Sequence, residues 1–189
     1  NGDGYSDLIV AADAYDNGQT DEGQAYVYMG SGSGLATTAA FTFESNQATA
    51  YVNWVSAAGD VNGDGYADLL VGMYENRRGG SATAGSAYVV YSPVSGTTSL
   101  SAAGAIISGT PGDFAGTIVA SAGDVDGDGF DDVLVGALGD GSGAAWLFSG
   151  PFSGVLGEGD ATARLYASHA DCGIGLTMAS AGDMDGDGR

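Results

Sequence analysis

An acidic nine-residue loop recurs along the chain, and its side chains have the types and spacing that bind a hard cation. The copy that starts at Asp60 reads DVNGDGYAD, and the copy that starts at Asp124 reads DVDGDGFDD. Carboxylate or amide oxygens stand at positions 1, 3, 5 and 9, position 7 offers its backbone carbonyl, and a glycine at position 6 permits the tight turn. Because calcium takes six to eight oxygen ligands at about 2.3–2.6 Å, the loop predicts a calcium site.

Two partial copies of the loop lie at the ends of the chain, so the motif occurs four times. Clustered carboxylates repel one another unless a cation compensates them, so copies in register favour metal binding over solvated acidic turns. The predicted ligands of the complete loops are Asp60, Asn62, Asp64, Asp68 and the Tyr66 carbonyl, and Asp124, Asp126, Asp128, Asp132 and the Phe130 carbonyl. Those of the partial loops are Asn1, Asp3, Asp7 and the Tyr5 carbonyl, and Asp183, Asp185 and Asp187.

Two other calcium motifs fit the loop poorly. An EF-hand needs a bidentate glutamate at position 12, where this chain has Val71 and Val135. Nonapeptide β-helix repeats follow one another in tandem, whereas the copies here are about sixty residues apart. The loop therefore closes at position 9 and belongs to a repeat with a long period.

The repeat period indicates which elements hold the loops. Position 3 falls at Asn1, Asn62, Asp126 and Asp185, which are 61, 64 and 59 residues apart. Each period holds four short runs of apolar or small residues between Gly and Ser clusters, which is typical of β-strands, and no long helical stripe. The predicted strands are 54–58, 68–72, 86–91 and 105–108 in one period and 118–122, 132–136, 144–148 and 163–167 in the next.

These features predict an all-β fold, a β-propeller of four-stranded blades of which about three are present. The continuous apolar runs LLVG and VLVG fit strands that neighbouring blades cover on both faces. A β-sandwich is the alternative, but it would not explain a fixed period near sixty. The expected blade boundaries lie near 1–50, 51–113 and 114–173, with a further blade starting at 174–189.

The loop and its surroundings resemble the FG-GAP repeats of integrin α subunits, which also occur in bacterial surface proteins. The D-x-[DN]-x-D-G-x-x-D pattern of the family matches both complete loops, while the FG and GAP elements of the family are degenerate in this chain. The FG element falls at Tyr51-Val52, Ala115-Gly116 and Ile174-Gly175, and the GAP element at 11–13, 72–74 and 136–138. The resemblance implies a seven-bladed extracellular propeller, calcium between the first two strands of a blade, and a role in adhesion or surface assembly.

The ends of the chain and its composition add two expectations. The chain starts at position 3 of one loop and ends at position 7 of another, so we expect a propeller fragment whose end blades pack against further blades of the same or a neighbouring chain, as in a filament. The absence of lysine and of any N-x-S/T sequon favours a bacterial secreted or cell-surface protein.

The charge excludes several classes of partner. The chain has 24 acidic residues against four arginines and no lysine, which gives a net charge of −20 at pH 7. This charge would repel the phosphates of nucleic acids and anionic membrane surfaces. No apolar run approaches the length of about 18 residues that a membrane-spanning helix needs. We therefore expect neither nucleic-acid binding nor membrane insertion.

The residues do not assemble a catalytic set, so we expect no enzymatic activity. The one histidine, His169, stands near Asp171 and Cys172, but no nucleophile-elbow or zinc-binding motif accompanies it. A protein partner or self-association is expected instead.

Two alternatives for the function stay open. One is a non-catalytic propeller attached to a secreted hydrolase. The other is a carbohydrate-binding propeller, because aromatic side chains could stack on sugars. The aromatic residues that suggest it are Tyr15, Tyr74, Trp54 and Trp146.

Overall fold

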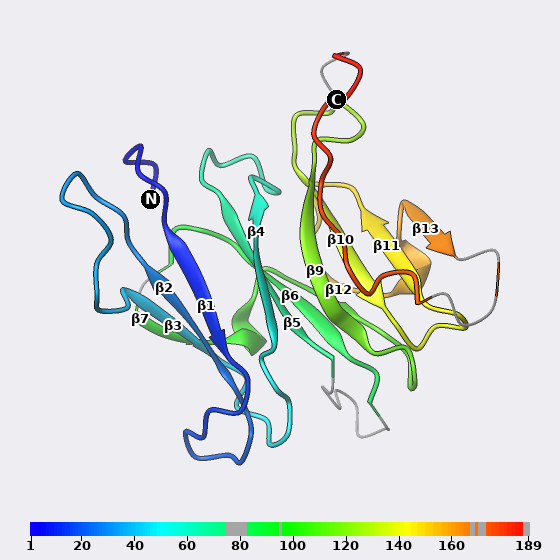
Figure 1. Cartoon of the computed structure of the whole chain (residues 1–189), viewed down its shortest axis with the longest axis horizontal. Helices are drawn as coiled ribbons and strands as arrows, with labels where there is room; N and C mark the ends of the chain where they lie inside the picture. Colours follow the sequence, from blue (N-terminus) through cyan, green and yellow to red (C-terminus); the bar gives the residue numbers. More distant parts are fainter. Residues whose placement is uncertain (75–82, 95, 167–168, 170–172, 187–189) are drawn as a thin grey trace.

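The computed structural model describes residues 1–74, 83–94, 96–166, 169 and 173–186. In these residues the chain forms thirteen β-strands and two 3-10 helices, and the strands make three twisted sheets that stand side by side (Figure 1). No α-helix occurs in this part of the chain. The all-β class and the stacked blades predicted from the period are confirmed.

Each sheet is built around an antiparallel run of strands. The first sheet has the order β1 (Leu8–Ala12), β2 (Gln24–Tyr28), β3 (Phe41–Glu44) and β7 (Gly96–Ser99). The second has the order β4 (Trp54–Gly59), β5 (Asp68–Met73), β6 (Ser86–Val90), β8 (Ala105–Ser108) and β12 (Gly154–Leu156). The third has the order β9 (Ala115–Gly123), β10 (Asp132–Ala137), β11 (Ala144–Phe148) and β13 (Ala163–Tyr166). The 3-10 helices are η1 (Leu100–Ala102) and η2 (Glu158–Asp160).

The eight strands predicted for the two complete periods correspond to β4, β5, β6, β8 and to β9, β10, β11, β13. Strands β7 and β12 were not predicted. Each leaves its own repeat and pairs in parallel with the outer strand of the preceding sheet, with Gly96 opposite Phe41 and Gly154 opposite Ala105. Both strands are short and begin at a glycine with positive φ. Neither carries the long apolar run by which strands are recognised in a sequence. The predicted blade boundaries stay predictions. The structure adds that a strand from one repeat pairs with the outer strand of the preceding sheet.

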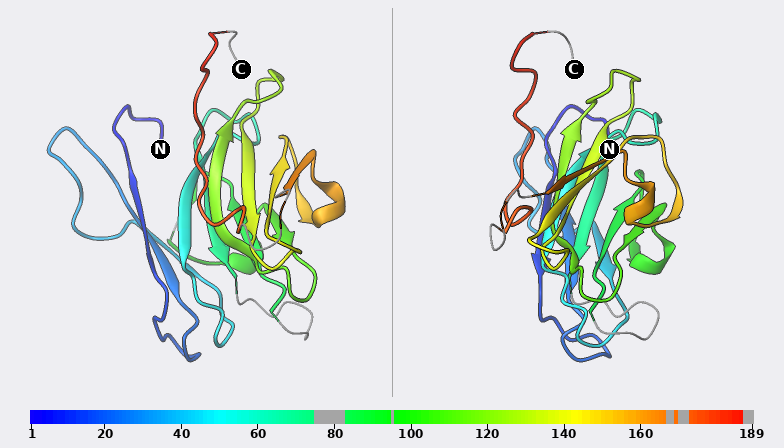
Figure 2. Two further views of the ribbon diagram at one scale, coloured as in Figure 1. Left: turned by 45° about the vertical axis from the view of Figure 1, so that its right-hand side comes forward. Right: turned by 90° about the vertical axis from the view of Figure 1, so that its right-hand side faces the viewer.

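Two apolar cores lie between the sheets, one on each side of the second sheet. The first joins Phe43 and Val52 to Tyr88 of β6, and the second joins Val89 of β6 to Trp146 of β11. All five residues of β6 are buried, because neighbouring sheets cover both of its faces. The LLVG run of β5 is covered on both faces as predicted, since Leu70 packs in the second core and Val71 in the first. In the VLVG run of β10, Leu134 is only half-buried. The three sheets stand in one stack (Figure 2).

Neighbouring sheets come within backbone contact near the FG and GAP elements. A Cβ added at Gly72 would collide with the carbonyl oxygen of Gly116 in the next sheet, and one at Gly136 would collide with the carbonyl oxygen of Gly175. Glycine is therefore required there for close approach. The loops after β4 and β9 lie at the same end of the stack as the N-terminal loop (Figure 1).

Candidate metal centre

The loop between β9 and β10 is folded around the carboxylate of Asp124. Its Oδ1 accepts hydrogen bonds from the backbone N–H groups of Gly127 (2.7 Å) and Asp128 (3.1 Å), and its Oδ2 accepts one from Gly129 (2.9 Å). Gly129 has a φ of +93°, which glycine adopts without strain. One carboxylate therefore holds the whole turn, as position 1 of a cation loop requires.

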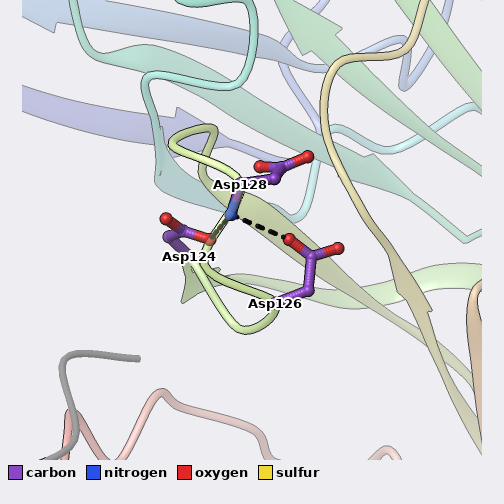
Figure 3. A group of neighbouring side chains, drawn as sticks. All are labelled: Asp124, Asp126 and Asp128. Carbon is purple, nitrogen blue, oxygen red and sulfur yellow. Dashed lines mark hydrogen bonds between the residues drawn. The ribbon is translucent and has the colours of Figure 1, made fainter.

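Three carboxylates converge in this loop. Asp126 Oδ1 accepts from the N–H of Asp128 at 3.2 Å, and Asp128 Oδ1 accepts from that of Phe130 at 2.9 Å. One oxygen each of Asp124, Asp126 and Asp128 lies within 4.8 Å of the others (Figure 3). Carboxylate oxygens are the donor set that magnesium, calcium and manganese prefer. The residues present fit a hard divalent cation.

Position 9 of the same loop serves a different contact. Asp132 is fully buried, and its two oxygens accept hydrogen bonds from the N–H groups of Val125 and Gly150, both at 2.9 Å. These bonds fasten the loop to the residues that follow β11. Burial raises the pKa of Asp132. Its carboxylate lies outside the converging group of three, so its role as a ligand stays a prediction.

The loop between β4 and β5 repeats this arrangement. Asp60 accepts from the N–H groups of Gly63 (2.8 Å), Asp64 (3.1 Å) and Gly65 (2.8 Å). Asn62 Oδ1 accepts from the N–H of Asp64 at 2.9 Å, and its Nδ2 donates to Asp64 Oδ2 at 3.0 Å. An amide thus replaces one carboxylate, so this loop gathers less negative charge than the next.

Asp68 is the counterpart of Asp132 and is also fully buried. Its oxygens accept from the N–H groups of Val61 (3.1 Å) and Ser92 (2.8 Å). Burial, opposed only in part by these bonds, raises the pKa of Asp68 to about 6. The ionised carboxylate is therefore disfavoured in the fold unless a cation stands near it.

The partial loops keep the bonds that their residues allow. At the start of the chain, Asn1 Oδ1 accepts from the N–H of Asp3 and Asp3 Oδ1 from that of Tyr5, each at 3.0 Å. Asp7 Oδ1 accepts from the N–H of Gly30 at 2.8 Å. Near the other end, Asp183 Oδ1 accepts from the N–H of Gly186 at 2.7 Å. Of the remaining predicted ligands, Asp185 lies on this turn, and Asp187 lies outside the described residues.

Neighbouring loops touch one another through residues that the motif does not predict. Asp131, at position 8 of the third-sheet loop, accepts from the N–H of Asp60 at 2.7 Å and donates its own N–H to the Asp60 carbonyl at 3.0 Å. Gly59 leaves room for this contact, since a Cβ there would collide with the Asp131 carboxylate. The ring of Phe130 lies against Gly63 in the same way that the Tyr66 ring lies against Gly2. The loops therefore form a connected row.

The Asp131 contact can be tested by replacing the residue with alanine, which the preceding loop already has at this position as Ala67. The Asp60 N–H loses a charged acceptor worth about 1.5–3 kcal/mol. Its amide hydrogen exchange should therefore accelerate roughly ten- to hundredfold, while the Val125 amide within the altered loop keeps its rate. An unchanged rate at Asp60, or equal acceleration at both amides, would contradict a specific bridge.

The aromatic residues considered for sugar stacking lie in different environments. Trp146 is 0% exposed in the core between the second and third sheets, so it is not a surface residue. Trp54 and Tyr15 are 42% exposed, and Tyr15 packs edge-on against Tyr26 at a centroid distance of 6.4 Å. Asp171 and Cys172, considered with His169, lie outside the described residues. No helix in the described part of the chain has the length and apolar character needed to cross a membrane.

Comparisons with known proteins agree with the loop geometry. An FG-GAP-like repeat matches residues 1–71, and an FG-GAP repeat matches residues 115–148, which include the loop of Figure 3. The chain is 33% identical over 115 residues to integrin alpha-3 of Cricetulus griseus, a match that covers 60% of this chain and 11% of the relative. The chain therefore contains FG-GAP repeats and is distantly similar to integrin alpha-3.

Proposed function

We propose that this chain is a calcium-stabilised extracellular module that binds a protein partner, or further copies of itself, in adhesion or surface assembly. The observation that supports it most is the convergence of Asp124, Asp126 and Asp128 in a loop whose geometry recurs in register. The chain spans only 11% of the length of the integrin relative, so the activity and partners of the whole protein belong to the proposal.

Calcium suits these loops better than magnesium. The loops offer side-chain and carbonyl oxygens along an exposed turn, and calcium accepts six to eight such ligands in flexible geometry. Magnesium demands a near-ideal octahedron and keeps several waters. Calcium would neutralise the carboxylates and hold each loop, and through the Asp131 contact the row of loops, in one conformation.

The proposed role is structural and binding, without catalysis. A net charge of −20 disfavours nucleic-acid partners. Carbohydrate binding is the weaker candidate. Of the aromatic residues that suggested it, Trp146 is buried in the core, whereas Trp54 and Tyr15 are exposed.

The proposal predicts that calcium raises the thermal stability of the chain. Extracellular modules bind calcium with dissociation constants of about 10⁻⁴–10⁻³ M, so about 1 mM calcium adds about 0.4–1.4 kcal/mol per site by linkage. Thermal unfolding followed by circular dichroism should show a higher midpoint in calcium than in EDTA, and a smaller rise in equimolar magnesium. A midpoint that is the same with calcium and chelator would refute a stabilising role.

A further inference from the structure

The insert between β1 and β2, residues 13–23, forms a built structure at the opposite end of the first sheet from the acidic loops (Figure 1). The N–H of Gly23 donates to the Tyr15 carbonyl at 3.0 Å, which closes the insert on itself. The N–H of Thr49 donates to the Thr20 carbonyl at 2.8 Å, and that of Tyr51 donates to the Asp21 carbonyl at 3.2 Å. The segment that leads into β4 therefore fixes the insert in place.

Glu22 is the feature of this insert that needs a chemical explanation. The residue is 0% exposed, and its Oε1 accepts a hydrogen bond from the N–H of Asn17 at 2.8 Å. Its Oε2 is buried and has no hydrogen-bond partner. A buried carboxylate oxygen without a partner is costly, because the group has lost water and gained nothing in return. A cation on the free side of Glu22 would offset this cost.

A second carboxylate stands beside Glu22. Glu44, at the end of β3, accepts from Asn17 Nδ2 at 2.6 Å and from Gln24 Nε2 at 2.7 Å. Asn17 thus binds Glu22 through its backbone and Glu44 through its side chain. The hydroxyl of Ser45 also donates to the Glu22 carbonyl at 3.0 Å, which fixes the two acidic residues next to each other.

The same insert holds a second acceptor without a partner. The amide oxygen Oε1 of Gln19 is buried and makes no hydrogen bond. The short insert therefore holds two buried oxygens without a donor, and the Glu44 carboxylate lies beside it. Carboxylate and amide oxygens are the ligands of calcium and magnesium.

No basic side chain in the described part of the chain compensates this charge. The ion pairs there join the N-terminus to Asp7 and Arg164 to Glu158, and neither reaches the insert. A bound cation would supply the positive charge that these described residues lack.

We propose that Glu22 Oε2, Glu44 and Gln19 Oε1 form a second kind of cation site, which binds a hard divalent cation such as calcium. Its ligands come from the insert between β1 and β2 and from the end of β3. The acidic loops contribute none of them. The third repeat has no counterpart of this insert, since the six residues 138–143 connect β10 to β11 there. A cation there would lock the insert to the first sheet.

Site-resolved titration of the full chain tests this proposal. In ¹⁵N-resolved NMR spectra, the amide signals of Asn17 and Gln24 should shift with added calcium along a saturable curve of their own. The amide of Gly127 reports the acidic loop separately. Glu22→Gln should weaken the response of the insert at least tenfold and leave Gly127 unchanged. Asp13→Asn is the matched control, because Asp13 is exposed and its side chain accepts from the adjacent Ala14 N–H, so both curves should persist.

The outcomes separate this site from the proposed calcium loops. If Gly127 responds and the insert stays silent up to about 10 mM calcium or magnesium, ten times the weakest extracellular affinities, the insert site is refuted and the loops stand. If the insert responds and Gly127 does not, the loops fail and the insert site stands. An insert response that survives both Glu22→Gln and Glu44→Gln would also refute the assignment. The wild-type titration decides the question even if a variant does not fold.

Discussion

Replacing Asp124 with alanine is expected to abolish calcium binding at the third repeat. The substitution removes one of three converging carboxylates and, at the same time, the acceptor of three backbone hydrogen bonds from residues 127–129. Calcium affinity at this loop should fall by more than about a hundredfold, since even residues that only support a metal ligand contribute ten- to a hundredfold. The loop should also lose about 1–3 kcal/mol of stability without metal, because backbone donors lose a charged acceptor.

Isothermal titration calorimetry of the full chain measures the lost site, and chemical denaturation in EDTA measures the metal-free part of the effect. Asp160→Ala is the control, because it removes the same charge from an exposed position of the third repeat outside the loop. The control should retain the stoichiometry of the wild type. An Asp124→Ala variant that binds as many calcium ions as the wild type, with equal affinity, would show that the converging carboxylates are not the site.

Asp68→Ala is expected to produce the largest loss of stability among single changes in the loops. The fully buried carboxylate satisfies the N–H groups of Val61 and Ser92, and alanine would leave both without an acceptor. Each orphaned buried donor costs about 1–3 kcal/mol, so the free energy of unfolding should fall by about 2–4 kcal/mol after partial relief of the buried charge. Asp13→Ala, at an exposed position, should change it by less than about 0.5 kcal/mol. A loss below about 1 kcal/mol for Asp68→Ala would contradict the role given to these bonds.

The same residue gives the metal-free protein a pH dependence whose sign is fixed by its pKa. The pKa of Asp68 is about 6 in the fold and 3.8 in its ordinary state, so the folded chain holds the proton more tightly than the unfolded chain. The contribution of Asp68 to stability is therefore full below about pH 4 and is lost as the pH rises through about 6. Denaturation in EDTA between pH 4 and 7 should show this slope in the wild type, and a shallower one in Asp68→Ala.

Much of the fold could be predicted from the sequence because the period is regular. The acidic loop marks the turn between the first two strands of a blade, so the apolar runs on either side of Asp60 and Asp124 could be placed in β4, β5, β9 and β10. Strands β7 and β12 could not be found in this way. Their pairing with a preceding sheet depends on the close packing of whole repeats, and the GTTS and GVL sequences carry no period-2 pattern.

The candidate site shows the same division. Spacing alone identified Asp124, Asp126 and Asp128 as neighbours, since they lie within one turn. The contact of Asp131 with Asp60 joins residues that are 71 positions apart, so no local pattern reveals it. The burial of Glu22 likewise depends on the distant segment before β4, so no local pattern reveals it.

Crystallographic location of calcium in the full chain tests the central claim most directly. Crystals grown at saturating calcium should show anomalous difference density in the loops that begin at Asp60 and Asp124. The surrounding oxygens, including those of Asp126 and Asp128, should lie at about 2.3–2.6 Å, with six to eight ligands for each ion. Empty loops at saturating calcium, or six oxygens at about 2.1 Å in a strict octahedron, would contradict calcium binding as the function of these repeats.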